Sequence, residues 1–244
     1  MAARLERRLA VQILRGERMP GSQLPSVRNL AREFGVTAPT IQRVVDRLAA
    51  TGLVSVRRGS GITVNDPETC GELTLLPLWF EALADQPERT ATMLRDFLEL
   101  RRVVAVHLMR TRRTRIVRAV TALADAAHAL ATEAGDVWAI AEADLAFTRT
   151  VLEASQQFAA NALFHTTEAL VRDVPGLAEA LYGDRSYHRR VIASVASLLA
   201  ASDGPDGNGE RKALAIERIL RAWDARTVER FREICVAAPH CAGS

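Results

Sequence analysis

Residues 24–64 read LPSVRNLAREFGVTAPTIQRVVDRLAATGLVSVRRGSGITV, and this stretch decides the fold of the first part of the chain. It contains two apolar patterns with helical spacing, each forming one face of a predicted helix. The first consists of Val27, Leu30, Ala31 and Phe34, and the second of Ile41, Val44, Val45 and Leu48. Gly35 lies between them and tolerates the positive φ of a sharp turn. The segment therefore predicts a helix-turn-helix.

Local signals mark the ends of both helices. Ser26 can accept a backbone N–H of the first turn, and Thr37 is a good N-cap for the second helix. Pro39 is tolerated in a first turn, where backbone N–H groups have no helical partner. Gly52 stands where a left-handed residue commonly ends a helix. These residues set the limits of the predicted pair of helices.

The residues after Gly52 predict a hairpin. Residues 53–57 and 62–64 look like short strands, and the Arg-Gly-Ser-Gly connection at 58–61 is basic and rich in glycine. Such a tip could contact the DNA backbone or the minor groove. We therefore predict a winged helix-turn-helix domain of α+β type over residues 1–66.

The outward face of the second helix carries candidate DNA contacts. Its N-terminal part would enter the major groove, where the base edges differ. Gln42 could bind an adenine edge through two hydrogen bonds, and Arg43 could bind a guanine or a phosphate. Other candidates lie at the helix start or on the wing, where phosphate oxygens are within reach. They are Thr37, Ala38, Thr40, Arg57, Arg58 and Gly59.

Charge is unevenly distributed along the chain. Residues 1–66 hold 11 arginines and 5 acidic residues, whereas the remainder holds 21 basic and 24 acidic residues. Positive charge concentrated in one module is what phosphate binding requires. The alternative is that residues 24–64 are a structural pair of helices with a hairpin and no DNA role. Such a structure does not require a concentration of positive charge.

Residues 5–64 resemble the N-terminal domain of the GntR family of bacterial transcription regulators. The resemblance is carried by the PG…LPS…R…LA..FGV core, the GLV step and the RRGSG wing. It implies that Arg28, together with the matching residues at 37, 40 and 58, touches DNA. The family usually has arginine at the position of Ala38, and its FadR branch often has another at Gln42. We therefore expect an altered operator sequence rather than a loss of binding, because phosphate contacts are spread over many groups.

The rest of the chain is predicted to be helical. Apolar residues recur at helical spacing within 94–108, 116–130 and 192–199, and no stretch beyond residue 66 alternates cleanly with period two. Breaks occur near Pro67, Pro87, Gly135, Gly183 and the loop 202–209. We expect a mainly α chain, with a linker at 67–78 and an all-α antiparallel bundle of about seven helices at 79–240.

Several classes of protein are disfavoured by what the sequence lacks. It has no apolar run long enough to cross a membrane and no signal-like leader. Cys70, Cys235 and Cys241 are odd in number and lack metal-like spacing, which fits a reducing cytoplasm. There is no phosphate loop, serine elbow or HExxH motif, and the only lysine, Lys212, lacks the context of a Schiff base. Neither an enzyme nor a bound cofactor is expected.

The helical part resembles the effector-binding domain of the FadR branch. Glu99-Leu100-Arg101-Arg102 matches the start of a long helix in that domain. Many members bind a divalent metal through one Asp and three His, and the resemblance places Asp144 and His188 among those ligands. Thr148 stands at the i+4 position where a second metal-binding side chain would share the helix face. The last histidine is absent from 216–224, so we expect no bound metal.

A pocket without a metal must hold its effector through arginines, hydroxyl groups or apolar walls. The candidate effector contacts are Arg101, Arg102, Asp144, Thr148 and His188. The fatty-acid regulator of this branch lacks the metal and binds long-chain acyl-CoA. A small organic acid and an acyl-CoA-like molecule are therefore both open as effectors.

The resemblance also implies the partners. Members of the family read palindromic half-sites, so we expect a cytoplasmic homodimer on double-stranded operator DNA, controlled by a small-molecule effector. The alternative is an architectural DNA-binding protein that needs no effector and has a fully packed bundle. A cavity of several hundred Å³ bordered by Arg101 or Arg102 and Asp144 would favour the sensor.

Overall fold

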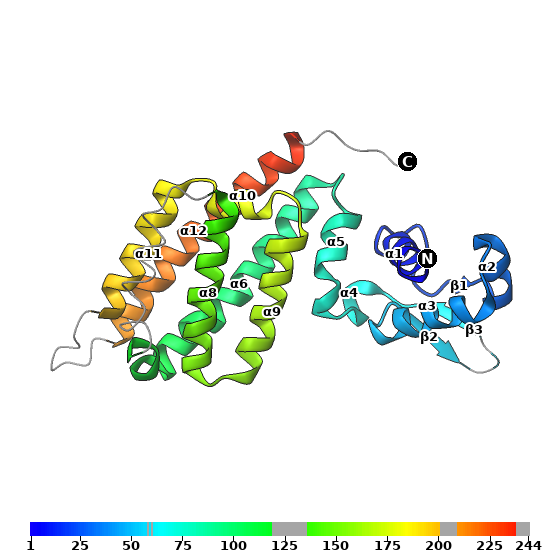
Figure 1. The fold of residues 1–244 in the computed structure, drawn as a ribbon, viewed down its shortest axis with the longest axis horizontal. Coiled ribbons are helices and arrows are strands. Elements are labelled where there is room, and N and C mark those ends of the chain that lie inside the picture. The colour runs from blue at the N-terminus through cyan, green and yellow to red at the C-terminus, as the bar shows by residue number, and fades with distance from the viewer. Residues whose placement is uncertain (58, 60, 119–135, 201–208, 238–244) are drawn as a thin grey trace. The chain divides into compact units, whose positions relative to one another are not determined.

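The computed structural model describes residues 1–57, 59, 61–118, 136–200 and 209–237 (Figure 1). The chain forms two compact units, Met1–Asp85 and Gln86–Ser244. It is mainly helical with one small sheet, which confirms the predicted fold class. Among the helices of the described ranges, none is long and apolar enough to cross a membrane.

The first unit contains the predicted helix-turn-helix and hairpin. Its main helices are α1 (Ala2–Leu14), α2 (Val27–Phe34) and α3 (Ala38–Ala50). Its strands are β1 (Gln23–Leu24), β2 (Val54–Arg57) and β3 (Gly61–Val64). The sheet is antiparallel in the order β1-β3-β2, and Val56 lies opposite Ile62 in the hairpin. Strand β1 was not predicted, because two residues carry no alternation and their pairing partner is distant in sequence.

The local signals at the helix ends are confirmed with one exception. The Ser26 hydroxyl accepts from the backbone N–H of Asn29 at 3.3 Å, and Gly35 has a φ of +63°. Gly52 has a φ of +79° and follows the end of α3. Thr37 is the N-cap residue of α3, but its hydroxyl lies 2.9 Å from that of Thr40 instead of capping a backbone N–H.

The apolar faces of α2 and α3 meet in a single core. Leu30 of α2 and Ile41, Val44 and Val45 of α3 have no exposed side-chain surface. They pack with residues of α1, β2 and β3 in one cluster. Each such aliphatic side chain contributes about 1.5–3 kcal/mol through burial. This core holds α3 in place and determines which of its residues face outward.

The segment predicted as a linker packs onto the first unit. It contains α4 (Pro67–Cys70), the 3-10 turn η1 (Leu73–Leu75) and α5 (Leu76–Ala82). Leu75 and Ala82 are buried in the same core as α1. The guanidinium Nε of Arg7 donates to Glu81 at 2.8 Å, and Arg15 contacts Asp85 at 2.5 Å. The compact unit therefore extends to Asp85, beyond the predicted boundary at residue 66, because α5 buries its apolar side against α1.

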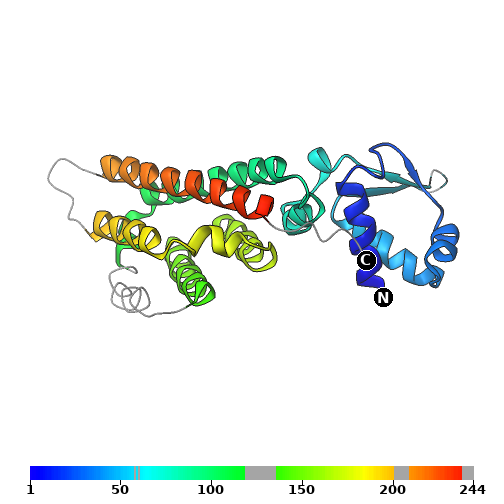
Figure 2. The ribbon, with the colours of Figure 1, turned by 90° about the horizontal axis from the view of Figure 1, so that it is seen from above.

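The second unit is a bundle of helices. They are α6 (Pro87–Thr111), α8 (Val137–Ser155), α9 (Phe158–Asp173), α10 (Leu177–Tyr182), α11 (Arg185–Ala200) and α12 (Gly209–Ala237). The long helices α6 and α12 lie side by side (Figure 2). They run antiparallel, since Glu88 of α6 contacts Arg232 of α12 while Arg110 contacts Glu210 at the other end. Most of the predicted helix at 116–130 and of the loop at 202–209 lies outside the described residues.

A second core joins four of these helices. Leu108 of α6, Leu152 of α8, Phe164 of α9 and Ile216 of α12 belong to one buried cluster. The start of α8 is fixed by Asp136, whose carboxylate accepts from the backbone N–H of Ala139 at 2.9 Å. This packing positions the polar residues discussed below.

Candidate DNA-binding face and effector cavity

Helix α3 exposes the face that was predicted to enter the groove. Ala38, Gln42 and Arg43 are exposed, while Ile41 and Val44 are buried on the opposite side. Of the two threonines at the helix start, Thr37 is exposed and Thr40 is half-buried. The exposed residues therefore share one face because their neighbours at helical spacing fill the core.

The other candidate DNA contacts lie on α2 and the wing. Arg28 is exposed in the first turn of α2. Arg57 is exposed at the end of β2, opposite Gly61 of β3, and Gly59 is exposed with a φ of +82°. Arg58, also predicted to touch DNA, lies outside the described residues. The hairpin register therefore places Arg57 next to the connection between the strands.

One polar contact on the outward face of α3 was not predicted. The side-chain nitrogen Nε2 of Gln42 donates to the carboxylate oxygen Oδ1 of Asp46 at 2.8 Å. The two residues are one helical turn apart, and both are exposed. Gln42 thus has a defined partner before any DNA is bound.

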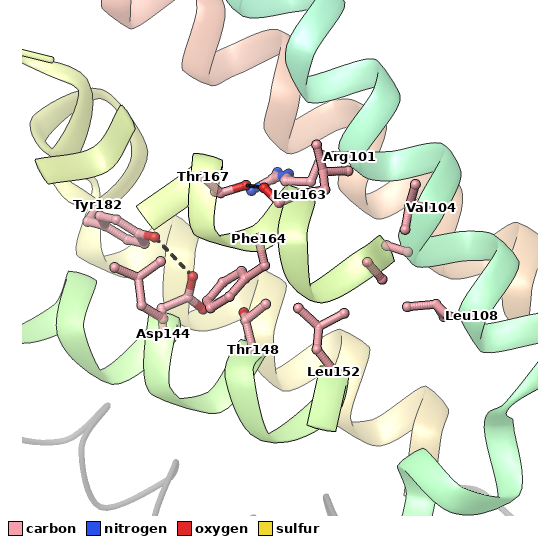
Figure 3. A pocket seen from close by; sticks show the side chains of 13 residues that line it. Arg101, Val104, Leu108, Asp144, Thr148, Leu152, Leu163, Phe164, Thr167 and Tyr182 are labelled. Atoms are coloured by element: carbon pink, nitrogen blue, oxygen red, sulfur yellow. Dashed lines mark hydrogen bonds between the residues drawn. The ribbon is translucent and has the colours of Figure 1, made fainter. Parts of the chain in front are cut away.

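A cavity of about 80 Å³ lies among α6, α8, α9 and α10 in the second unit (Figure 3). Figure 3 shows Tyr182 and Asp144 at one end, and Leu108 and Leu152 toward the other. Its apolar wall is formed mainly by Val104, Leu108, Leu145, Leu152, Leu163 and Phe164. Its polar side chains are Arg101, Asp144, Thr148, Thr167 and Tyr182. The cavity can therefore accommodate a molecule with one polar and one apolar end.

Asp144 is the centre of a small polar network. The Tyr182 hydroxyl donates to its Oδ2 at 3.0 Å, and His188 Nε2 lies 3.6 Å from its Oδ1. Burial raises the pKa of Tyr182 well above its usual range, and the negative charge of Asp144 raises it further. The His188 ring also packs against Tyr182 and Trp223, with centroids 5.1 and 5.5 Å away. Two predicted residues from distant helices, Asp144 and His188, are thus brought together.

This network does not fit the four-ligand metal site that the resemblance implies. Asp144 and His188 supply two donors, and His188 Nε2 is buried without a hydrogen-bond partner. Thr148 supplies only a hydroxyl, and the Trp223 ring occupies the space beside the imidazole. Within the described residues, no three His, Cys, Asp or Glu side chains form a group that could hold an ion. Sites for zinc and related ions usually have at least three protein ligands.

Arg101 and Arg102 converge on a residue that sequence reasoning missed. Arg101 donates to Asp224 Oδ1 at 2.9 Å, and Arg102 donates to Asp224 Oδ2. The Arg101 guanidinium also lies over the Trp223 ring, 5.6 Å from its centroid. Arg101 lines the cavity, whereas Arg102 and His188 are not among its lining residues. No local pattern could have found Asp224, because its partners are more than a hundred residues away in sequence.

Comparisons with known proteins find similarity to bacterial regulators in the first unit. Residues 1–64 match the sequence model of "Bacterial regulatory proteins, gntR family". The HTH-type transcriptional regulator Mce2R of Mycobacterium tuberculosis is 40% identical over 93 residues, which make up 38% of this chain and 38% of Mce2R. The matched part of the chain therefore spans well under half of that relative.

Two further similarities extend over most of the chain. The HTH-type transcriptional regulator Rv0494 of Mycobacterium tuberculosis is 28% identical over 232 residues, covering 94% of this chain and 90% of that protein. A solved structure of Lar, described as controlling the Listeria monocytogenes agr system, covers 96% of this chain and 97% of its own. Its sequence identity to this chain is 14%, and the TM-score is 0.48. The curated relatives are named as regulators rather than enzymes.

Proposed function

We propose that this chain, whose residues 1–64 match the gntR family of bacterial regulatory proteins, acts as a dimeric, metabolite-responsive regulator of transcription. The observation that carries this proposal is the exposed face of α3 on a module rich in arginine. An α-helix with exposed polar residues at its N-terminal end fits the major groove. The localisation expected of such a regulator is the cytoplasm.

The candidate contacts divide into two kinds. Arg28, Thr37 and Thr40 suit phosphate oxygens, which position the domain without reading sequence. Gln42 and Arg43 suit base edges, which specify sequence. The wing, with Arg57 and Gly59, supplies further backbone contacts. Two copies of the domain would read a palindromic site with half-sites about one helical turn, 34–36 Å, apart.

The cavity is bordered by Arg101 and Asp144, as expected of a sensor, but its volume is below the several hundred Å³ expected, so it supports only a compact effector. Its volume of about 80 Å³ exceeds what a water molecule needs, which is about 10–15 Å³. It is smaller than the cavity of about 150 Å³ that holds benzene in another protein. A long acyl chain does not fit this volume, so of the two effector classes we favour a small organic acid.

The positive charge beside Arg101 supports the same class. Asp224 accepts from both Arg101 and Arg102, so the three side chains together carry one net positive charge. Arg101 keeps further N–H donors that can face the cavity. A ligand carboxylate would bind beside Arg101, on the opposite side of the cavity from the Asp144 carboxylate. Its short carbon skeleton would contact the leucines.

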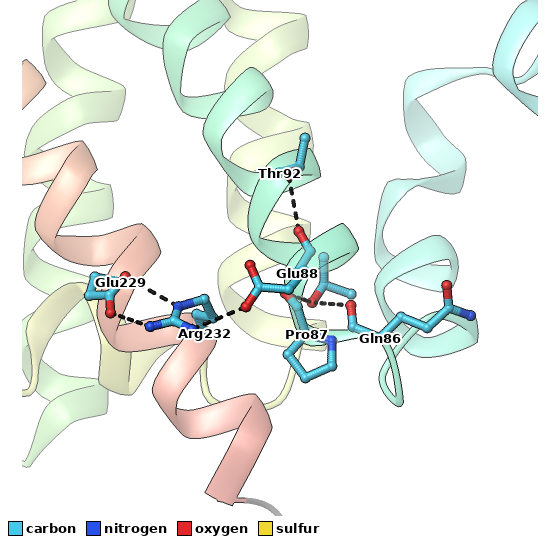
Figure 4. Close-up of polar contacts among 7 residues, drawn as sticks. Gln86, Pro87, Glu88, Thr92, Glu229 and Arg232 are labelled. Carbon is cyan, nitrogen blue, oxygen red and sulfur yellow. Dashed lines mark hydrogen bonds and ion pairs between the residues drawn. The ribbon is translucent and has the colours of Figure 1, made fainter.

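Helix α6 connects the cavity to the DNA-binding unit. The first unit ends at Asp85, and α6 begins two residues later, at Pro87. Arg232 of α12 pairs with Glu88 at this end and also contacts Glu229 (Figure 4). An effector that shifts α6 at Arg101 would therefore also move the start of α6, where the helix follows the first unit. Its differential affinity for two domain orientations would set the size of the response.

The proposal is tested by DNA-binding isotherms across salt concentrations with and without short organic acids. Specific binding should weaken as salt rises, with a log–log slope of about −0.9 for each phosphate contacted. At least one acid should change operator affinity and raise the melting temperature of the chain. Equal affinity for all duplexes and no response to any acid would favour the architectural protein instead.

Two substitutions separate the kinds of contact. Arg28→Ala should weaken binding to all duplexes and reduce the salt slope by about one. Gln42→Ala should relax the preference at one base pair while leaving the salt slope unchanged. If Gln42→Ala left the preferred sequence unaltered, the placement of α3 in the groove would be wrong.

A further inference from the structure

The hydrogen bond between Gln42 and Asp46 lies on the surface that faces DNA under the proposed function. Gln42 Nε2 donates to Asp46 Oδ1 at 2.8 Å across one turn of α3. Both side chains are exposed, on the side of the helix opposite the buried Ile41, Val44 and Val45. The contact therefore stabilises no core. Its consequence concerns what Gln42 presents to a base.

The chemistry of the two groups determines how the amide is turned. A glutamine amide has one acceptor, Oε1, and two N–H donors on Nε2, while a carboxylate only accepts. Only the nitrogen of Gln42 can face Asp46, because the flipped amide would set two acceptors against each other. Once one N–H is used, Oε1 and the second N–H remain. When the N–H trans to Oε1 is the one that Asp46 accepts, Oε1 and the other N–H lie side by side on the outer edge of the amide.

This remaining pair matches one base. In the major groove adenine presents an acceptor, N7, beside a donor, the N6 amino group. Guanine presents two acceptors, so its O6 would lie against Oε1 of Gln42. Resting on the proposed DNA-binding function, we propose that Asp46 is a specificity-determining residue that holds Gln42 in the orientation that reads adenine. Asp46 itself is a positioning residue, since it acts through Gln42.

The negative charge of Asp46 has a second effect. A carboxylate on the groove face is repelled by the phosphates of every duplex, whatever its sequence. Asp46 therefore lowers affinity for DNA in general while it sharpens the choice of base. A residue that merely stabilised α3 would have the opposite signature, because its removal would weaken binding to all duplexes.

The test uses the full chain and a pool of duplexes with a randomised central segment. Wild type defines the preferred site, and dissociation constants are then measured for that site and for single-base variants at each conserved adenine. Asp46→Ala should lower the preference for adenine over guanine at one position by about threefold to tenfold, part of what a bidentate contact supplies. Asp46→Asn should lower it less, because an asparagine amide can still accept from Gln42 Nε2 but can also turn and donate to Oε1. Both variants should bind random duplexes more tightly than wild type.

Two controls separate positioning from charge. Glu33→Gln removes a negative charge from α2, where the Glu33 carboxylate lies 3.6 Å from Arg18, and should leave base preference unchanged. In a Gln42→Ala background, Asp46→Ala should cause no further loss of preference, because the two residues act as a unit. Melting curves should show the same stability for all these variants.

The outcomes are distinguishable. A wild-type chain that selects no sequence contradicts the proposed function. A chain that selects a site, but keeps its adenine preference in Asp46→Ala, contradicts only the role of Asp46. An additional loss in the double variant, or a site indifferent to Gln42→Ala, also overturns the inference.

Discussion

Replacement of Asp224 by alanine is expected to destabilise the helical unit strongly. Its carboxylate accepts from Arg101 of α6 at 2.9 Å and also from Arg102. The Asp224 side chain is 7% exposed, and that of Arg102 is 11% exposed. Asp224→Ala would therefore leave two guanidinium groups without their partner, one of them almost wholly out of water.

The size of the loss follows from this burial. Removing one partner of a buried ion pair costs about 3–5 kcal/mol, because the remaining charge is uncompensated. Arg101 is 24% exposed and can regain some hydration, which places the expected loss near the lower limit. For a domain of this size, a loss of about 3 kcal/mol lowers the melting temperature by about 6–12 °C.

Chemical denaturation of matched variants would measure the effect. Glu217→Ala is the control, since Glu217 lies on the same helix and pairs with Arg221, which is 67% exposed. An exposed pair at this spacing contributes about 0.2–0.5 kcal/mol. A Trp79→Phe background would leave the tryptophans of the second unit as the fluorescent probes, so that its unfolding is followed separately. Equal losses in the two variants would refute the buried ion pair as a determinant of stability.

Three further predictions concern other parts of the molecule. A fragment ending at Asp85 should be more stable to urea than one ending at residue 66, by about 2 kcal/mol or more, because only the longer one contains α5 packed on α1; equal midpoints would contradict this packing. Gly52→Ala should destabilise the first unit more than Gly35→Ala. Both glycines have a positive φ, but only at Gly52 would an added Cβ collide with the Cys70 carbonyl. Similar melting temperatures of the two variants would argue against the collision. In a Tyr187→Phe variant, where Tyr182 is the remaining tyrosine, phenolate absorbance should appear well above pH 10 and together with unfolding. Because the pKa of Tyr182 is raised in the folded protein, the stability contributed by its neutral hydroxyl is complete below pH 10 and is lost as the pH rises through the pKa of the folded state. Ionisation of Tyr182 near pH 10 in the folded protein would contradict its burial.

The helix-turn-helix could be predicted because its determinants are local. Ser26 caps a helix that starts at the next residue, and Gly35 supplies the turn where the apolar pattern breaks. The spacing of the aliphatic residues shows which face of α3 is buried, and hence that Gln42 is exposed. All of these relations span a few residues, within the range of one or two helical turns.

The elements that were missed depend on distant partners. Strand β1 exists because it pairs with β3, and α5 joins the first unit because α1 covers its apolar side. Likewise, the resemblance drew attention to Asp144 and His188 as metal ligands. The structure adds Tyr182 and Trp223 to their surroundings, and with them a network of hydrogen bonds and ring contacts.

The sequence by itself determined that the chain has an arginine-rich winged domain followed by helices, because periodicity, caps and charge are written along the chain. Only the tertiary structure decided the boundary at Asp85, the volume and lining of the cavity, and the pairing of Asp224 with two arginines. It also decided that the amide of Gln42 is held by Asp46. The physical reason is that burial and side-chain orientation result from packing between segments far apart in sequence, which no local pattern encodes.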